Sequence, residues 1–505
     1  MTSESQSIAS GNPALDCILN GGFTADRVYL IDGHPGTGKT TLAMQFLLEG
    51  ARCGEKGLYV SLSETREELL AVADSHGWTL EGIDIHELVD PTAGLQAESQ
   101  YTMFQPSEVE LGETTLAMLK RVQELNPQRV VLDSLSELRL LSQNSLRYRR
   151  QILALKQFFV SRKCTVLFLD DKTTPDNDLQ LQSIAHGVIS LERVPVEFGI
   201  ERRRLRVVKF RGRHFIGGWH DFEIKRGGLA IYPRIAASFS EHGPASRTAL
   251  SSGNLSLDTL LGTGIEPGTS TLIMGPAGVG KSSCATLYAA AACERGECAV
   301  LFAFDESRQT LLVRSAGLGM DLESYEKSGL LEICPVNPGE ISPGQFAHMV
   351  RQSVAPRSDN KRVTVVIIDS LNGYLSAMPE ERFLQVQMHE LLTYLSGCGI
   401  ATFLLVAQHG MLGAAMKSPV DTSYLADTVL LFRYFESEGE IRQAISVVKK
   451  RDGIHERTIR EFRMQHGEIV VGKPLQQFHG ILAGTPIFTG SQDKLIRKHQ
   501  KNDDN

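Results

Sequence analysis

The chain has 505 residues, of which 42% are hydrophobic and 22% are charged, enough for two or three globular domains. No apolar run reaches the ~18 residues of a membrane helix, and the start MTSESQSIASGN lacks the segments of a signal peptide. Eight cysteines without a C-x-x-C pair suggest neither a zinc site nor a disulfide framework, and the net charge of −7 argues against a nucleic-acid coat. We therefore expect a cytoplasmic globular protein that binds no membrane.

An internal duplication covers most of the chain. A shift of 242 residues places Ser252 on Ser10, and the two halves then align without a gap for over seventy residues. The segment VVLDSL matches VIIDSL at a shift of 236, and VVKFRGRH matches VVKKRDGIH at a shift of 240. A repeat this long is a duplicated domain of roughly 230 residues rather than a solenoid unit. We predict a first domain over 1–235, a linker over 236–249, a second domain over 250–490 and a disordered tail over 491–505.

Each half contains a phosphate-binding loop near its start. The stretches GHPGTGKT and GPAGVGKS both satisfy G-x-x-x-x-G-K-[ST], between an apolar run typical of a buried strand and a helical stretch. In such loops backbone N–H groups surround phosphate oxygens and the lysine reaches the β- and γ-phosphates. The predicted ATP-binding residues are Gly33, Gly36, Thr37, Gly38, Lys39, Thr40 and Thr41 in the first half, and Gly275, Gly278, Val279, Gly280, Lys281, Ser282 and Ser283 in the second.

A strand-end aspartate follows in each half. Asp133 ends the apolar run RVVL, and Asp369 ends TVVII. A carboxylate at this place, together with the loop hydroxyls of Thr40 and Ser282, would hold Mg²⁺. The sequence therefore predicts Mg-ATP as the ligand of both halves.

A glutamate lies 25 residues after each loop lysine, at the end of a second apolar strand. These residues are Glu64 and Glu306, which we expect at the carboxyl edge of the sheet, facing the phosphate loop. A carboxylate there can accept a proton from water or from a hydroxyl. The second half has a carboxylate pair, Asp305-Glu306, where the first has Ser63-Glu64.

A basic K-x-R motif recurs near the end of each half. Lys209 and Arg211 follow an alternating strand pattern that begins at Glu201, and Lys449 and Arg451 occupy the corresponding places. Fixed cations stabilise the charge that develops on a γ-phosphate and are often supplied by a neighbouring subunit. Two other interpretations of these basic residues are a solvated sheet edge without a function and a run of arginines that binds DNA.

These motifs together resemble the KaiC family of tandem RecA-like ATPases, from Ser10-Gly11-Asn12 to FHGILAGTP at 478–486. The resemblance implies an α/β protein of two tandem RecA-like P-loop domains, each a mostly parallel sheet flanked by helices. It also implies a homohexameric double ring that binds ATP between subunits, with the K-x-R strand facing the neighbour's nucleotide. The first ring would be mainly an ATPase, and the second would also phosphorylate and dephosphorylate itself. A KaiB-like or other signalling protein is the implied partner.

The stretch DTSYLADT at 421–428 matches the phosphoacceptor segment of this family. Ser423 matches the acceptor serine, but Tyr424 stands where the clock proteins have a threonine. Ser423, or Thr422 as a substitute, is therefore a candidate phosphoacceptor. The alternative is that Asp421, Thr422 and Ser423 only cap a turn.

Two other functions compete with a self-regulating ATPase and serine/threonine kinase. A DNA-stimulated recombination or repair ATPase of the RecA/RadA type is supported by Gln408, at the end of a predicted strand. Against it are the acidic net charge and only two tryptophans for stacking on bases, so we expect no nucleic-acid partner. A scaffold that binds nucleotides without turnover is disfavoured because both halves keep their glutamate and aspartate.

Overall fold

The computed structural model describes residues 6–88, 106–142, 144–172, 178–195, 200–235, 248–357, 361–376, 381–408, 423–437, 439–465, 468–482 and 487–488. The chain divides into two compact units, Met1–Arg234 and Ile235–Asn505. Most of the predicted linker, at 236–247, and the whole predicted tail lie outside the described residues. Each unit is considered by itself.

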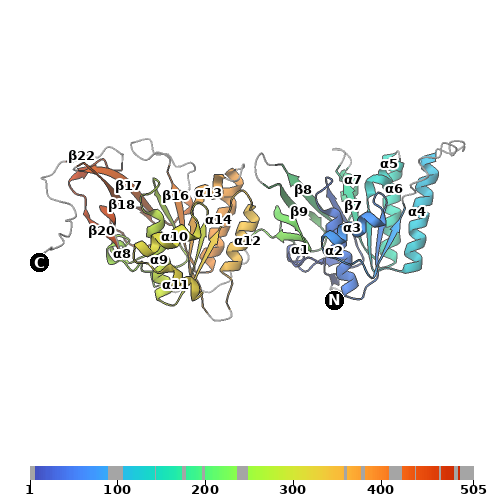
Figure 1. The fold of residues 1–505 in the computed structure, drawn as a ribbon. Coiled ribbons are helices and arrows are strands. Elements are labelled where there is room, and N and C mark those ends of the chain that lie inside the picture. Colours follow the sequence, from blue (N-terminus) through green and yellow to red (C-terminus); the bar gives the residue numbers. More distant parts are fainter. Residues whose placement is uncertain are drawn as a thin grey trace, which may run out of the picture. The chain divides into compact units, whose positions relative to one another are not determined.

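The first unit is built on a nine-stranded sheet in the order β11-β10-β9-β8-β3-β7-β6-β4-β5. Figure 1 draws this unit in blue to green, with β7, β8 and β9 of the sheet labelled. The six strands from β8 to β5 are parallel, and β9, β10 and β11 continue the sheet antiparallel. Its strands are β3 (Val28–Gly33), β4 (Gly57–Ser61), β5 (Ile83–Glu87), β6 (Arg129–Asp133), β7 (Thr165–Asp171), β8 (Gly187–Val194), β9 (Arg202–Phe210), β10 (His220–Lys225) and β11 (Gly228–Tyr232), and a separate pair is β1 (Ser7–Ile8) with β2 (Phe23–Thr24).

Helices flank the first sheet on both faces, which is why its inner strands are continuous apolar runs. Every residue of β3, β4 and β6 is buried. The helices are α1 (Pro13–Ile18), α2 (Lys39–Arg52), α3 (Arg66–Ser75), α4 (Pro106–Leu125), α5 (Leu135–Ser142), α6 (Ser145–Ser161) and α7 (Asp178–Ile184).

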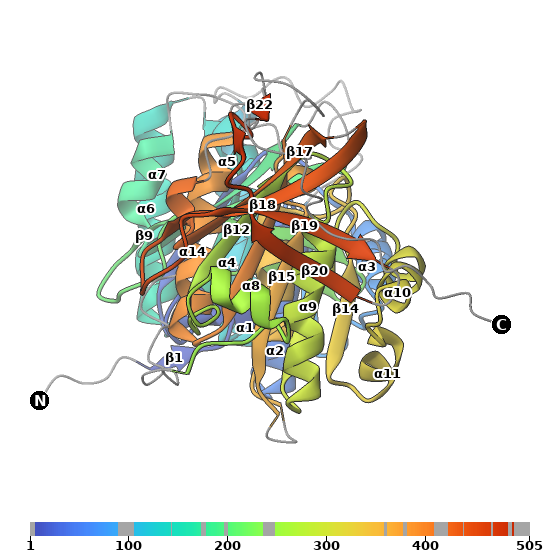
Figure 2. The same ribbon diagram turned by 90° about the vertical axis from the view of Figure 1, so that its left-hand side faces the viewer.

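The second unit repeats this architecture in the order β14-β13-β15-β16-β12-β17-β18-β19-β20. Figure 2 shows its antiparallel arm, β17 to β20, in orange and red. Its strands are β12 (Ser270–Gly275), β13 (Cys298–Ala303), β14 (Leu331–Pro335), β15 (Val363–Asp369), β16 (Ala401–Ala407), β17 (Thr428–Ser437), β18 (Glu440–Lys450), β19 (Ile459–Gln465) and β20 (Glu468–Pro474), with a separate pair β21 (Phe478–His479) and β22 (Ile487–Phe488). Its helices are α8 (Leu255–Leu260), α9 (Lys281–Glu294), α10 (Arg308–Gly317), α11 (Leu322–Lys327), α12 (Pro343–Ser353), α13 (Leu371–Ser376), α14 (Glu381–Gly397) and the 3-10 helix η2 (Ser423–Leu425). The predicted α/β fold, with a mostly parallel sheet in each half, is confirmed.

The repeated Ser-Gly-Asn sequence joins the start of each unit to its last strands. The side chain of Asn12 accepts hydrogen bonds from two N–H groups of α1 and donates to the carbonyl of Leu229 in β11 at 2.6 Å. Asn254 caps α8 by accepting from one N–H group, that of Leu257, and donates to the carbonyl of Ile469 in β20 at 2.7 Å. The motif is therefore explained by the fold, because the cap satisfies helix N–H groups that would otherwise lack partners.

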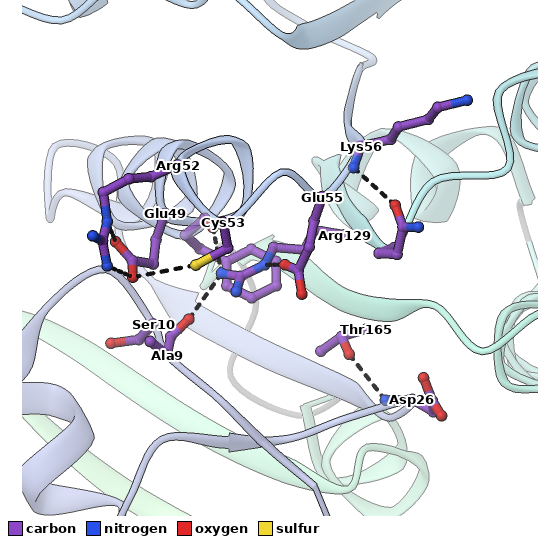
Figure 3. Close-up of polar contacts among 12 residues, drawn as sticks. Ala9, Ser10, Asp26, Glu49, Arg52, Cys53, Glu55, Lys56, Arg129 and Thr165 are labelled. Carbon is purple, nitrogen blue, oxygen red and sulfur yellow. Dashed lines mark hydrogen bonds and ion pairs between the residues drawn. The ribbon is translucent and has the colours of Figure 1, made fainter.

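A buried arginine in the first unit has no counterpart at the equivalent position of the second unit, which is occupied by Val365. Arg129, at the start of β6, is 2% exposed and donates to the carbonyls of Ala9 and Phe46 at 2.8 and 2.7 Å (Figure 3). It also pairs with Glu55, and its guanidinium lies 4.7 Å from the centre of the Phe46 ring. These contacts compensate the buried charge and join the amino-terminal segment to α2 and β6. They are structural and lie away from the phosphate loop.

All eight cysteines are free thiols. Among the described helices, none has the length and apolar character needed to cross a membrane.

Candidate nucleotide sites

The first phosphate loop leaves the carboxyl end of β3 and leads directly into α2. Gly38, the residue before the helix, has φ +93°, a conformation that favours glycine. The ammonium of Lys39 donates to the carbonyls of Gly33 and His34 at 2.9 and 3.1 Å. The loop thus holds its lysine above the helix N-terminus, where phosphate oxygens bind.

The second loop has the same geometry. Gly280 has φ +100°, and Lys281 donates to Gly275 and Pro276 at 3.0 and 2.7 Å. Burial lowers the pKa of Lys281 to about 8, opposed by the negative charge of Asp369. A cavity of about 630 Å³ opens over this loop. All four charged residues that were predicted to act within one chain in this half line the cavity: Lys281, Asp305, Glu306 and Asp369. Arg314, which was not predicted, also lines it.

The two strand-end aspartates lie beside the loop hydroxyls, as expected for a metal site. The hydroxyl of Thr40 donates to Asp133 at 3.2 Å, and Tyr59 donates to the same carboxylate oxygen. Burial raises the pKa of Asp133, and these two hydrogen bonds oppose the shift. Burial likewise raises the pKa of Asp369, and a hydrogen bond from Ser282 opposes it.

These residues fit a magnesium ion that arrives with a nucleotide. The described residues contain no group of three or more His, Cys, Asp or Glu side chains that could hold a metal ion alone. One carboxylate and one hydroxyl beside each phosphate loop instead match the way Mg²⁺ is usually bound, with phosphate oxygens and water as its other ligands.

Glu64 lies in the loop after β4, three residues past the strand end at Ser61 rather than on the strand itself. The hydroxyl of Ser61 accepts from the N–H of Glu64 at 3.0 Å and donates to its carbonyl, so the loop holds this residue in place. The Oε2 atom of Glu64 is buried without a hydrogen-bond partner. Burial raises the pKa of Glu64, and the negative charge of Asp133 raises it further. A carboxylate with one unused, desolvated oxygen is suited to accept a proton.

The corresponding carboxylates of the second unit are both engaged. Asp305 accepts a hydrogen bond from Ser370 at 2.5 Å. Glu306 forms a two-point ion pair with Arg314, at 3.1 and 2.9 Å, and Arg314 also donates to Ser283 at 2.8 Å. The sequence comparison of the halves contained a signal for this residue, because the 242-residue shift places Arg314 on Val72.

Asp171 is a second residue that the sequence analysis missed. It ends β7, next to β3, and its carboxylate lies 2.7 Å from the ammonium of Lys39. Its signal was the pair Asp170-Asp171 after the apolar run TVLFL, a strand-end carboxylate like the one that identified Asp133.

The K-x-R cations lie towards the amino-terminal ends of the parallel strands, whereas the phosphate loop of the same unit leaves a carboxyl-terminal end. Lys209 pairs in register with Val188, which pairs with Leu30, three residues before Gly33 in β3. Lys209 donates to the carbonyls of Gln182 and Ala185, and Arg211 donates to Ser183. These cations therefore do not join the nucleotide site of their own unit.

The second K-x-R motif is placed in the same way. Lys449 pairs with Val429, which pairs with Leu272, three residues before Gly275. Lys449 donates to the carbonyl of Ala426 at 2.7 Å, and Arg451 forms an ion pair with Asp427 at 3.0 Å.

The candidate acceptor segment, residues 421–428, leads into β17 and contains Asp427, the partner of Arg451. Ser423 begins the 3-10 helix η2, Tyr424 is 49% exposed and donates to Gln385 at 3.3 Å, and Asp427 accepts from Ser270 as well as from Arg451. Thr422 and the side chain of Ser423 lie outside what the structure describes.

The arginine run that precedes Lys209 is engaged within the unit. Arg204 forms an ion pair with Glu192 at 2.9 Å, and Arg203 lies 3.7 Å from Glu201. Arg204 and Arg206 both lie over the ring of Trp219. Gln408 follows β16, and its N–H donates to Gly275 at the start of the phosphate loop. A DNA-stimulated ATPase of the recombination type is not favoured.

Comparison with known proteins agrees with this geometry. The family described as ATPase: KaiC matches residues 8–236 and again residues 250–476. The chain is 26% identical to the circadian clock protein KaiC3 of Synechocystis sp. over 498 residues, covering 97% of this chain and 96% of that protein. It is 28% identical to the circadian clock oscillator protein KaiC of Synechococcus elongatus over 510 residues, covering 98% and 95%. With two phosphate loops, two buried strand-end aspartates and two family matches in tandem, the chain belongs to the KaiC ATPase family.

Proposed function

We propose that each half of the chain binds Mg-ATP and hydrolyses it. The observation that carries the proposal is the pairing of a loop hydroxyl with a buried aspartate in each half, beside a lysine that the phosphate loop holds in position. Two such sites in one chain of the KaiC ATPase family support turnover at both.

The roles of the residues follow from their positions. Lys39 and Lys281 bind the β- and γ-phosphates, while Thr40 with Asp133, and Ser282 with Asp369, hold the metal ion. When bound, Mg²⁺ neutralises part of the phosphate charge. The unpartnered oxygen of Glu64 takes a proton from the attacking water in the first site, and the pair Asp305 and Glu306 does so in the second.

Removing one lysine at a time tests this assignment. Lys39→Ala and Lys281→Ala should each abolish the turnover of one site, and the double variant should retain no activity above background in a phosphate-release assay. Chelation of Mg²⁺ should have the same effect on the parent protein. Turnover that persists in the double variant would show that other residues hydrolyse ATP. A higher rate of ATP hydrolysis by the parent protein in the presence of single-stranded DNA would instead favour the recombination or repair ATPase.

We further propose that the chain assembles as a homohexamer in which the K-x-R cations act on the neighbour's nucleotide. The supporting observation is that these cations lie at the amino-terminal end of the parallel strands, whereas the loops leave the carboxyl end. A KaiB-like or other signalling partner and a cytoplasmic location remain predictions from the sequence.

A serine/threonine autokinase activity of the second half is the finer part of the proposal. The relatives' likeness and the position of Ser423, four residues before Asp427 and its ion pair with Arg451, support it. After incubation with Mg-ATP, intact mass and phosphopeptides over 417–428 should reveal phosphate on Ser423 or Thr422. Glu306→Gln is the control that should lose it. Steady ATP hydrolysis with no phosphorylated peptide would mean that the segment only caps a turn.

A further inference from the structure

The phosphate-loop lysine of the first site is already bound to a carboxylate. The ammonium of Lys39 lies 2.7 Å from Oδ1 of Asp171, in addition to its bonds to two loop carbonyls. The side chain of Lys39 is only 8% exposed, so little water screens this ion pair. Ser136 donates to the other oxygen of Asp171 at 3.1 Å and fixes the orientation of the carboxylate.

The second site lacks this carboxylate. Asp171 stands opposite Gly33 in the pairing of β3 with β7, and Ala407 stands opposite Gly275 in the equivalent pairing of β12 with β16. Among the described residues, Lys281 forms no ion pair, and its ammonium donates to two loop carbonyls. One substitution between the repeats therefore adds a negative charge directly beside one of two otherwise similar lysines.

A γ-phosphate at the first site must share the ammonium with Asp171. Both are negative and both would lie within a few ångströms of the same nitrogen, so their repulsion opposes the attraction of Lys39. A diphosphate presents only its β-phosphate, which lies nearer the loop backbone, so it meets less of this repulsion.

We propose that Asp171 is a specificity-determining residue that lowers the preference of the first site for nucleoside triphosphate over diphosphate. The second site, with Ala407 at this place, does not carry this penalty. The inference deepens the proposed function and rests on it, because it requires that Lys39 binds nucleotide phosphates.

The first experiment measures two affinities at the first site alone. In a full-length chain whose second site is disabled by Lys281→Ala, Mg-ADP and the non-hydrolysable analogue Mg-AMP-PNP are titrated by calorimetry, with Asp171 and with Asp171→Asn. Asparagine keeps the size of the side chain and can still accept from Ser136. We expect AMP-PNP to bind about tenfold more tightly in the Asp171→Asn variant, and ADP to change by less than about threefold.

The reciprocal variant is the matched control. In a chain whose first site is disabled by Lys39→Ala, Ala407→Asp should weaken AMP-PNP binding at the second site more than ADP binding. This arm keeps the test decisive if Asp171→Asn does not fold.

The outcomes separate this inference from the proposed function. If both variants leave the ratio of the two affinities unchanged, or if Asp171→Asn weakens AMP-PNP, the role of Asp171 is overturned while nucleotide binding stands. If neither probe binds the Lys281→Ala chain, the first site is not a nucleotide site and both proposals fail.

Discussion

Single residues distinguish two nucleotide sites that otherwise share their geometry. The first has Asp171 beside its lysine where the second has Ala407, and the second has Arg314 beside its glutamate where the first has Val72. The first site therefore has an additional negative charge beside its lysine, and the second has an additional positive charge beside its glutamate. Such changes alter affinity and rate without disturbing the shared strands and helices.

Arg314 should position Glu306 for proton transfer. Its guanidinium holds both carboxylate oxygens and also Ser283, so it joins α10 to the first turn of α9. In a Lys39→Ala background, Arg314→Val should lower kcat of the second site about tenfold with a smaller change in KM. Arg314→Lys should recover part of the loss, since a lysine keeps the charge without the planar fork. An unchanged kcat, or a change confined to KM, would exclude the positioning role.

At the scale of elements, the repeated caps and the sheet order account for much of the conserved pattern between the halves. Asn12 and Asn254 each join a short first helix to the antiparallel end of the sheet.

The antiparallel strands of the first unit are held in place by His220, which is fully buried at the start of β10. Its Nε2 atom lies 3.0 Å from the carbonyl of Ile216, and its Nδ1 atom accepts from the N–H of Arg234 at 2.9 Å.

This arrangement makes the stability of the first unit depend on pH. A protonated His220 could no longer accept from Arg234, and burial lowers its pKa from 6.5 to about 4. Because the unfolded chain binds the proton first, the stabilisation is complete above pH 6.5 and is lost as the pH falls towards 4. The free energy of unfolding, measured with urea, should fall by about 1–2 kcal/mol more between pH 7 and pH 5 for the parent than for His220→Gln. Equal losses in the two proteins would contradict the assignment.

At the scale of the whole molecule, each unit carries its phosphate loop and its K-x-R cations at opposite ends of its parallel strands. The phosphate loop opens at the carboxyl ends of these strands, and the K-x-R cations lie towards their amino ends. The lysine of the motif is level with a residue three positions before the loop, which separates the two by about 10 Å or more along the strand. A head-to-tail ring brings such opposite faces of neighbouring subunits together. The geometry of one chain thus fits sites that are completed by a neighbour.

Mixing two inactive variants tests this arrangement. In a Lys39→Ala background, Arg451→Ala and Glu306→Gln should each lower second-site turnover, because one lacks the donated cation and the other lacks a carboxylate of the receiving pocket. In randomly mixed assemblies about a quarter of the interfaces would combine an intact pocket with an intact arginine, and turnover should recover in proportion. No recovery, with exchange of subunits verified by mass, would mean that Arg451 acts within its own chain.

The sequence by itself determined the duplication, both phosphate loops, the strand-end aspartates and the α/β fold. These are local patterns, in which a buried strand, a glycine-rich turn and a helix follow one another within some twenty residues. It also placed Glu64 and Glu306 near the carboxyl edge, although both lie in loops just beyond their strands.

Only the tertiary structure decided which charges meet. Asp171 reaches Lys39 because β7 lies beside β3, and Arg314 reaches Glu306 and Ser283 because α10 packs near the start of α9. The register of β9 and β18 places the K-x-R motifs towards the amino-terminal ends of the parallel strands, away from the phosphate loop of the same unit. Such contacts join residues distant in sequence, and they depend on strand order and register, which local propensity does not encode.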